Sequence, residues 1–413
     1  MRHSLFFQKK IITILFLILI NFKTQALETY NLYLDADFSG AKASSISIQQ
    51  GIETALFEVN HKLFKYQLNL VIKNHRGNSL RSKRNLEAFL QDPNALLVFS
   101  GLHSPPILAN KKFINQNEIL LLDPWAAAGP ITRTTHKKNW IFRLSIDDQK
   151  AGFIISDNAI KEGFTKPFLL LEDTGWGRSN EKTITKALKQ KNLKPMGVKW
   201  FNWGIGKNHA RLTLREIKPL ADVIFFVGNA TEGKTFAKAM SELSSDERLP
   251  IRSHWGITGG DFADIINKDI RQSLDLQFIQ TSFSFNSDKL TALPTSVFNT
   301  AKKNFKQLLT PQDIKAQTGF IHGYDLTKIL ISAINQSGLT GDKKQDQHNI
   351  HKALESLQKP VEGLIKTYIK PFSPYMINQP DAHEALSFND YVMAYYGDDN
   401  EIILIKNNEK IGL

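Results

Sequence analysis

The stretch ALLVFSGLHSPPILANKKFINQNEILLLDP, residues 95–124, contains one complete strand–helix–strand unit. The apolar run at residues 95–99 predicts a strand, and the unbroken apolar run at residues 119–122 predicts a second strand that is buried on both faces. Between them, Ser104-Pro105-Pro106 predicts the start of a helix, because serine is a preferred N-cap and proline suits the first helical position. Strands that alternate with helices in this way indicate a parallel sheet.

The same alternation continues on both sides of this unit. Upstream, we expect strands at residues 30–34 and 68–72, a loop at residues 35–44, and helices at residues 48–59 and 85–90. Downstream, a second series is expected, with strands at 167–171, 222–227 and 250–253 and helices at 147–162, 177–190 and 231–243. Two successive series predict two lobes, with a linker near residues 141–147.

The C-terminal third returns to helix and then to strand. Residues 324–337 place apolar side chains on one helical face and are followed by Gly338, a typical residue just past a helix end. The polar segment 341–347 predicts a loop. Residues 391–405 alternate into two strands around Gly397-Asp398-Asp399-Asn400, which predicts a hairpin.

The N-terminus has the three parts of a secretory signal peptide. Positive charges at Arg2, Lys9 and Lys10 precede an apolar run at residues 11–20, and Thr24-Gln25-Ala26 offers small residues at a cleavage site. The run is short for a membrane span of about 20 residues, so cleavage is favoured over an uncleaved anchor. We therefore expect residues 1–26 to be removed near Ala26 and the mature chain to be periplasmic.

The amino-acid composition excludes some classes of function and disfavours others. The chain has no cysteine, which excludes thiol nucleophiles and zinc–thiolate sites. The net charge is +12, and removing the four positive residues of the signal, which has no acidic residue, leaves about +8. These charges are scattered, so a solvated basic surface is expected and nucleic acid is not an expected partner. No second long apolar run occurs, so no membrane insertion is expected after cleavage.

Several segments, in their order and spacing, resemble the type I periplasmic binding proteins, specifically the leucine/isoleucine/valine-binding branch of ABC-transporter receptors. Asp173-Thr174-Gly175-Trp176-Gly177 resembles the Asp-x-x-Tyr-Gly turn of that family, and Gly323-Tyr324-Asp325 resembles the start of its Tyr-Asp helix. Residues 50–60, 101–124 and 141–149 resemble its first helix, its ligand loop with the following strand, and its first crossing between lobes. The resemblance covers nearly all of the predicted mature chain.

The resemblance implies an α/β fold of two Rossmann-like lobes with parallel sheets, joined by a hinge of three crossings. Lobe one is expected at residues 27–146 plus 283–385, and lobe two at residues 147–282 plus 386–413. A small solute would bind in the cleft between the lobes, and binding would close them by hinge motion. A monomeric binding protein, and not an enzyme, is implied.

The family's site also maps onto this sequence. Ser104 takes the position of a serine that holds a ligand carboxylate, where a helix start offers free N–H groups and a favourable dipole. Trp125-Ala126-Ala127 would form the adjoining wall, and Ser44 aligns with a further cleft residue. The alternative is that Ser104 serves only as a helix cap and that Trp125 packs in the core, but a place in the site is expected for both.

Four positions depart from the amino-acid-binding pattern. Ala127 stands where a threonine hydroxyl meets the ligand ammonium, and Trp255 stands where an acidic residue balances it. Trp176 and Asn229 replace two cleft tyrosines. The missing hydroxyl and carboxylate argue against an ordinary α-amino acid. The tryptophans favour an aromatic ligand or a quaternary amine, unless they simply pack in the core.

The sequence gives little evidence for a metal site or for hydrolase chemistry. His348 and His351 share a helix face without an evident third ligand, and His383-Glu384 lacks the second histidine of a zinc-protease helix. No Gly-x-Ser-x-Gly elbow is present, which disfavours a secreted hydrolase. We expect no metal and no cofactor. Two functions stay open: a receptor that delivers its solute to an ABC permease, and a sensor that reports its ligand to a membrane kinase or cyclase.

Overall fold

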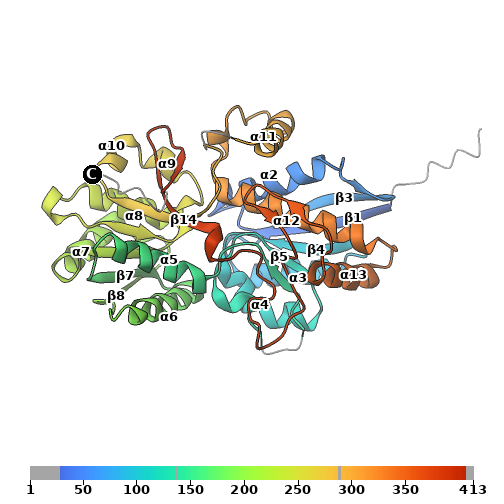
Figure 1. Cartoon of the computed structure of the whole chain (residues 1–413), viewed down its shortest axis with the longest axis horizontal. Coiled ribbons are helices and arrows are strands. Elements are labelled where there is room, and N and C mark those ends of the chain that lie inside the picture. The colour runs from blue at the N-terminus through green and yellow to red at the C-terminus, as the bar shows by residue number, and fades with distance from the viewer. Residues whose placement is uncertain (1–27, 135–137, 287–289, 406–413) are drawn as a thin grey trace, which may run out of the picture.

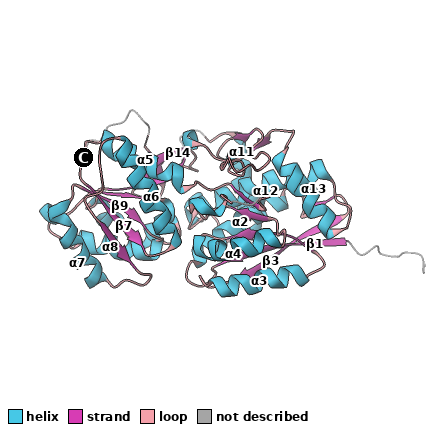
Figure 2. Cartoon of the chain, turned by 90° about the horizontal axis from the view of Figure 1, so that it is seen from below, coloured by secondary structure: helices cyan, strands magenta, loops and turns pink. Residues whose placement is uncertain are grey.

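The computed structural model describes residues 28–134, 138–286 and 290–405, and these form two α/β lobes side by side (Figure 1). In Figure 2 helices surround the strands of each lobe, so each sheet lies between helical layers. The predicted fold class is therefore confirmed. The predicted signal peptide lies outside the described residues. Within those residues, no helix is both long enough and apolar enough to cross a membrane.

The sheet of lobe one has the strand order β2-β3-β1-β4-β5-β6. All its neighbours pair in parallel except β2, which forms a short antiparallel edge. The strands are β1 (Glu28–Ala36), β2 (Lys62–Leu63), β3 (Tyr66–Asn74), β4 (Ala95–Ser100), β5 (Leu121–Asp123) and β6 (Ile141–Arg143). Every residue of β4 is buried, as an apolar strand between two helical layers requires.

The helices of lobe one come from both halves of the chain. They are α2 (Lys42–Phe57), α3 (Ser79–Gln91), α4 (Ser104–Gln116), α11 (Ala292–Asn304), α12 (Gln317–Ser337) and α13 (Lys343–Glu355). Helices α2 and α12 pack at very short range because of two glycines. A side chain at Gly51 would meet the Phe320 carbonyl oxygen at 2.1 Å, and one at Gly323 would meet the Ile48 carbonyl oxygen at 2.7 Å.

Lobe two has the strand order β15-β14-β11-β10-β9-β7-β8. The strands from β8 to β11 in this order are parallel, and the predicted C-terminal hairpin adds β14 and β15 in antiparallel pairing. Its strands are β7 (Pro167–Glu172), β8 (Val198–Phe201), β9 (Val223–Val227), β10 (Ile251–Ser253), β11 (Leu276–Thr281), β14 (Tyr391–Tyr396) and β15 (Ile402–Leu404). Its helices are α5 (Asp148–Lys161), α6 (Gly175–Gln190), α7 (Lys207–Ile217), α8 (Ala230–Ser241), α9 (Phe262–Ile265) and α10 (Lys268–Gln272). A separate ribbon pairs β12 (Val361–Glu362) with β13 (Thr367–Tyr368).

Two local predictions were wrong. The expected loop at residues 341–347 is mostly helix, because Asp342 caps α13 by accepting a hydrogen bond from the Gln345 N–H at 2.8 Å. Ser104 is the first residue of α4 and not its N-cap, a position that His103 occupies. The chain passes between the lobes after β6, after β11 and before β14, and the exact lobe boundaries given above stay a prediction.

The hinge is held by backbone pairing between its first and third crossings. The Arg143 N–H donates to the His383 carbonyl at 2.9 Å, and the Ala385 N–H donates to the Arg143 carbonyl at 3.0 Å. Asp147, four residues further on, caps α5 by accepting from the Gln149 N–H at 2.6 Å. The hinge backbone is therefore fixed next to the first helix of lobe two.

A buried ion network fills the space between these crossings. Fully buried Arg143 and almost buried Lys150 each donate to the Glu384 carboxylate at 2.7 Å, and the Thr132 hydroxyl donates to it at the same distance. Burial alone would raise the pKa of Glu384, but the charges of Arg143, Lys150 and Arg133 outweigh it and hold that pKa well below its ordinary value. The carboxylate thus stays ionised and satisfied inside the hinge.

Replacing Glu384 by Gln should destabilise the protein by about 3–5 kcal/mol, because Arg143 and Lys150 would lose their nearest counter-ion and keep the more distant Asp147, at 4.0 and 3.4 Å. Urea unfolding at pH 7 measures this loss. Glu216→Gln is the matched control, since Glu216 pairs with Lys199 at the exposed surface and should leave the unfolding midpoint nearly unchanged. Equal midpoints for the two variants would contradict a structural role for the network.

Candidate functional site

The two lobes face each other through the carboxyl ends of their parallel strands. Lobe one contributes the loops after β1, β3 and β4, and lobe two contributes the loops after β8, β9 and β10. Ligands of open α/β sheets bind in the crevice outside the carboxyl ends of the strands. The topology therefore places the loops best suited to hold a ligand on both walls of one cleft.

This cleft contains two adjoining cavities of about 580 and 310 Å³. Both are lined by the loop and first turn that begin α2 and by the start of α8. Five lining residues are common to the two cavities: Gly40, Ala41, Ala230, Thr231 and Gly259. The smaller cavity alone has room for a small metabolite, and the pair forms one continuous interlobe cleft.

Direct contacts close the cleft along one side. The Ser44 hydroxyl donates a short hydrogen bond to the Gly259 carbonyl across the lobes. Lys315 pairs with Asp264 at 2.9 Å, and the Gly129 N–H reaches the Asp148 carboxylate at 3.3 Å. The lobes are thus in contact, as in a closed arrangement.

The charges that line the cleft are unevenly matched. Its carboxylates are Asp37, Glu232, Asp261 and Asp313. Each already accepts from the protein, respectively from His103, the Gly204 N–H, Lys234 and the Thr310 N–H. Two lining cations, Lys42 and Arg76, make no ion pair with any residue in the described ranges. Lys42 and Arg76 are thus the charged lining side chains that have no partner in the described ranges, whereas Glu232 and Asp313 accept from backbone N–H groups and form no ion pair there.

The smaller cavity also has an aromatic wall. The indole ring of Trp203 lies 5.1 Å from the His103 imidazole, and Trp203 is 42% exposed, which is unusual for so large an apolar side chain. His103 in turn contacts Asp37 at 3.3 Å. Burial would raise the pKa of Asp37, but the hydrogen bonds from His103, Gly40 and Ser39 outweigh burial and hold the pKa below its ordinary value.

Glu172, at the end of β7, lies directly behind this wall. Its carboxylate accepts from the Thr174 hydroxyl at 2.7 Å, from the Asn229 amide at 3.0 Å and from the Trp203 indole N–H at 3.3 Å. Only 1% of its surface is exposed, and burial raises its pKa to about 7. Glu172 therefore orients two cavity-lining side chains and can change charge near neutral pH.

The eight residues predicted from the sequence all lie at facing ends of the lobes, at or beside strand ends and helix starts. Asn229 lines the smaller cavity. The other seven do not line either cavity: Ser44, Ser104, Trp125, Ala126, Ala127, Trp176 and Trp255. Whether these side chains touch a ligand stays a prediction.

The three tryptophans form part of the packed joint between the lobes. Trp125 and Trp255 are each 1% exposed, and Trp176 donates its indole N–H to Asp148 at 3.0 Å. Trp255 packs against the rings of His322 and Tyr391, with centroids 5.2 and 6.0 Å away. In this closed arrangement their aromatic surface faces protein.

The small residues complete the same joint. The Ser104 hydroxyl accepts from the Ala128 N–H at 3.2 Å, the Ala126 N–H donates to Asp123 at 2.8 Å, and the Ala127 carbonyl accepts from the Asp148 N–H at 3.0 Å. All three predicted residues are buried. The sequence analysis missed Arg76, Trp203 and Glu172, and the strand that precedes Trp203 was not predicted either.

Comparison with protein families gives a match that spans most of the chain. The sequence profile of the family described as periplasmic binding protein matches residues 34–383. None of the curated protein sequences gives a significant match to this chain.

Solved structures with the same fold are numerous but distant in sequence. The periplasmic binding protein type 1 from Bordetella pertussis Tohama I has 15% identity and a TM-score of 0.75, covering 92% of this chain and 100% of its own. The solute-binding protein of an ABC transporter from R. palustris, in complex with 4-hydroxybenzoate, has 14% identity and a TM-score of 0.75, covering 92% and 96%. A leucine-binding protein from Thermotoga maritima MSB8 has 14% identity and a TM-score of 0.70, covering 91% and 98%.

The raised pKa of Glu172 predicts a pH-dependent stability. Between about pH 4.5 and 7 the unfolded chain releases the Glu172 proton while the folded chain keeps it, so the native state loses on the order of 3 kcal/mol as pH rises. Glu172→Gln cannot ionise and should gain stability relative to the unmodified protein by that amount at pH 8, with little difference at pH 4.5. Urea unfolding across this range measures the difference.

Asp173→Asn is the matched control, because Asp173 is an exposed neighbour paired with Arg178. The control should run parallel to the unmodified protein at all pH values. A constant difference between Glu172→Gln and the unmodified protein would show that Glu172 keeps an ordinary pKa in the fold.

Proposed function

This chain belongs to the periplasmic binding protein family, and we propose that it is the solute receptor of an ABC transporter that binds a small aromatic carboxylate in the interlobe cleft. The observation that carries the proposal is the pair of unpaired cations, Lys42 and Arg76, on a cleft whose wall is an exposed tryptophan. In this proposal the protein is a periplasmic monomer that binds its ligand without chemical change.

We infer the charge of the ligand from the hydrogen-bond donors in the cleft that have no partner in the protein. Arg76 offers a planar guanidinium that can bind a carboxylate through two hydrogen bonds. The start of α8 adds N–H groups without intrahelical partners, because Asn229 places no side-chain cap on them. An anion that enters between Arg76 and α8 replaces its lost hydration with these donors.

The same features disfavour the two other ligand classes. An α-amino acid needs a free carboxylate for its ammonium group, and each lining carboxylate already has a protein partner. A quaternary amine prefers an aromatic cage without neighbouring cations, whereas Lys42 and Arg76 would repel it. The expectation of a ligand other than an ordinary α-amino acid is kept, and the aromatic class is preferred over the amine.

The aromatic part of the ligand is inferred from Trp203. Its indole, beside the His103 ring, is positioned for stacking on a flat group, which offset aromatic pairs favour. The R. palustris protein of the same fold was solved with 4-hydroxybenzoate, whereas the T. maritima protein is a leucine-binding protein. The fold thus accepts both classes, and the residues of this cleft favour the first.

The proposal predicts that benzoate-type acids raise the melting temperature of residues 27–413 and that Arg76→Gln weakens their binding about 10- to 100-fold. The reason is the loss of a charged hydrogen-bond donor worth about 1.5–3 kcal/mol. A thermal-shift screen of aromatic acids, amino acids and quaternary amines identifies the ligand class, and calorimetry then measures the affinity of each variant.

Arg81→Gln is the matched control, because Arg81 is an exposed cation on α3 that does not line either cavity. It should bind like the unmodified protein. Stabilisation by amino acids or amines alone, or equal affinity of the Arg76 and Arg81 variants, would contradict the proposed ligand and its site.

A further inference from the structure

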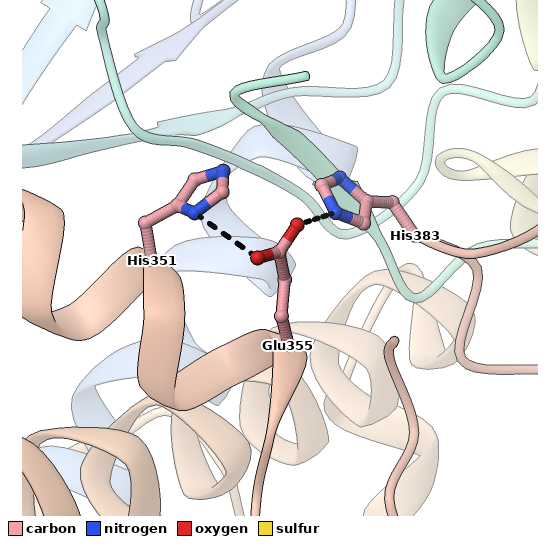
Figure 3. Close-up of side chains that lie close together, drawn as sticks. All are labelled: His351, Glu355 and His383. Carbon is pink, nitrogen blue, oxygen red and sulfur yellow. Dashed lines mark hydrogen bonds and ion pairs between the residues drawn. The ribbon is translucent and has the colours of Figure 1, made fainter. Parts of the chain in front are cut away.

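Two histidines and a glutamate meet beside the third crossing of the hinge (Figure 3). His351 and Glu355 are four residues apart on the last turns of α13, so they share one helical face. His383 immediately precedes Glu384 of the hinge ion network. The ligand atoms of these three side chains all lie within 4.8 Å of one another.

Each imidazole is fixed by a backbone carbonyl on its far side. The His351 Nε2 lies 2.8 Å from the Asn139 carbonyl oxygen, and the His383 Nδ1 lies 3.0 Å from the Ile141 carbonyl oxygen. A carbonyl oxygen can only accept a hydrogen bond, so both of these ring nitrogens carry hydrogen. In a neutral imidazole the other nitrogen then has a lone pair.

In Figure 3 the other nitrogen of each imidazole faces the Glu355 carboxylate. The His383 Nε2 lies 3.0 Å from one Glu355 oxygen, and the His351 Nδ1 lies 3.7 Å from the other. The Tyr375 N–H donates to Glu355 at 3.1 Å and holds the carboxylate in place. Two nitrogen lone pairs and a carboxylate are all electron donors, so the cluster needs either a shared proton or a metal cation between them.

We propose that His351, Glu355 and His383 bind a divalent transition metal ion, with Zn²⁺ the best match. Imidazole nitrogen and carboxylate oxygen are ordinary zinc ligands, and three protein ligands leave one position for water. Metal-binding histidines almost always donate their other N–H to a carbonyl or carboxylate, as both rings do here. The His351 and Glu355 side chains are 11% and 17% exposed, so solvent reaches the cluster.

Metal at this place would tie α13 of lobe one to the last crossing. The imidazole of His383 is stacked on Phe142 of β6, with ring centroids 3.8 Å apart. Binding would therefore brace both strands of the hinge next to Arg143 and Glu384. This role is separate from the solute cleft, and it does not depend on which solute the protein binds.

A metal-free arrangement is the competing account. In it, His383 is an imidazolium that donates to Glu355, and the lone pair of His351 faces the carboxylate at 3.7 Å without a partner. The two accounts differ in one measurable property, which is stoichiometric binding of metal.

The test uses untagged protein, residues 27–413, stripped with a chelator and titrated with ZnCl₂ by calorimetry. One equivalent should bind, and Co²⁺ at the same site should give visible absorption bands of a low-coordination centre. His351→Gln should weaken Zn²⁺ binding by at least about 100-fold, since even an outer-shell partner of a zinc ligand contributes 10- to 100-fold.

His348→Gln is the control, because His348 lies one turn away on α13 and pairs with exposed Glu118. It should bind Zn²⁺ like the unmodified protein. If circular dichroism shows that His351→Gln is misfolded, Glu355→Gln replaces it with the same expected loss. Absence of one equivalent of bound metal, or equal affinity of the cluster variant and the His348 variant, would overturn the proposal.

Discussion

The structure depends on one buried ion cluster, in which Arg143 and Lys150 share the carboxylate of Glu384. A charge without water is stable in a protein only when an opposite charge and hydrogen bonds replace its hydration. Here that condition is met by residues from two crossings that lie about 240 positions apart in the chain. The cluster therefore couples the register of the hinge to the correct docking of the C-terminal segment.

The cleft follows from this hinge. With the crossings held in register, the strand ends of the lobes face each other, and the starts of α2 and α8 reach the same cavities. Some polar groups that line the cleft already have hydrogen-bond partners in the protein, and other side chains leave surface free for a ligand. Asp37 and Glu232 accept from the protein, whereas Arg76 and Trp203 present their surfaces to the cavity. That division favours an aromatic anion as the solute.

The sequence predicts the order of elements well because short apolar runs mark buried strands such as β4 and β9. It missed β8, where a lysine and half-exposed side chains hide the strand, and β11, whose apolar residues are interrupted by two glutamines. It also missed the helices α7 and α11 and the start of α13, whose first turns are polar. Their assignment depends on pairing and packing across the chain, which local patterns do not contain.

The site was harder to predict for the same reason. Ser44 and Asn229 were predicted from their alignment with the family's cleft residues, and of the two Asn229 lines a cavity. The exposure of Trp203, the burial of Glu172 and the meeting of His351 with His383 arise only when the distant segments fold together. The departures from the family pattern at Ala127 and Trp255 were visible in the sequence, but their close packing in the joint between the lobes was not.

The position of β14 limits the order in which the parts of the chain can fold. This strand pairs with β11 in the sheet of lobe two, although more than a hundred residues of lobe one separate them. Until residues 391–396 have left the ribosome or the export channel, β11 has an open edge, which is a surface prone to aggregation. The sheet of lobe two is therefore completed by β14 and β15 only after the second part of lobe one has been synthesised.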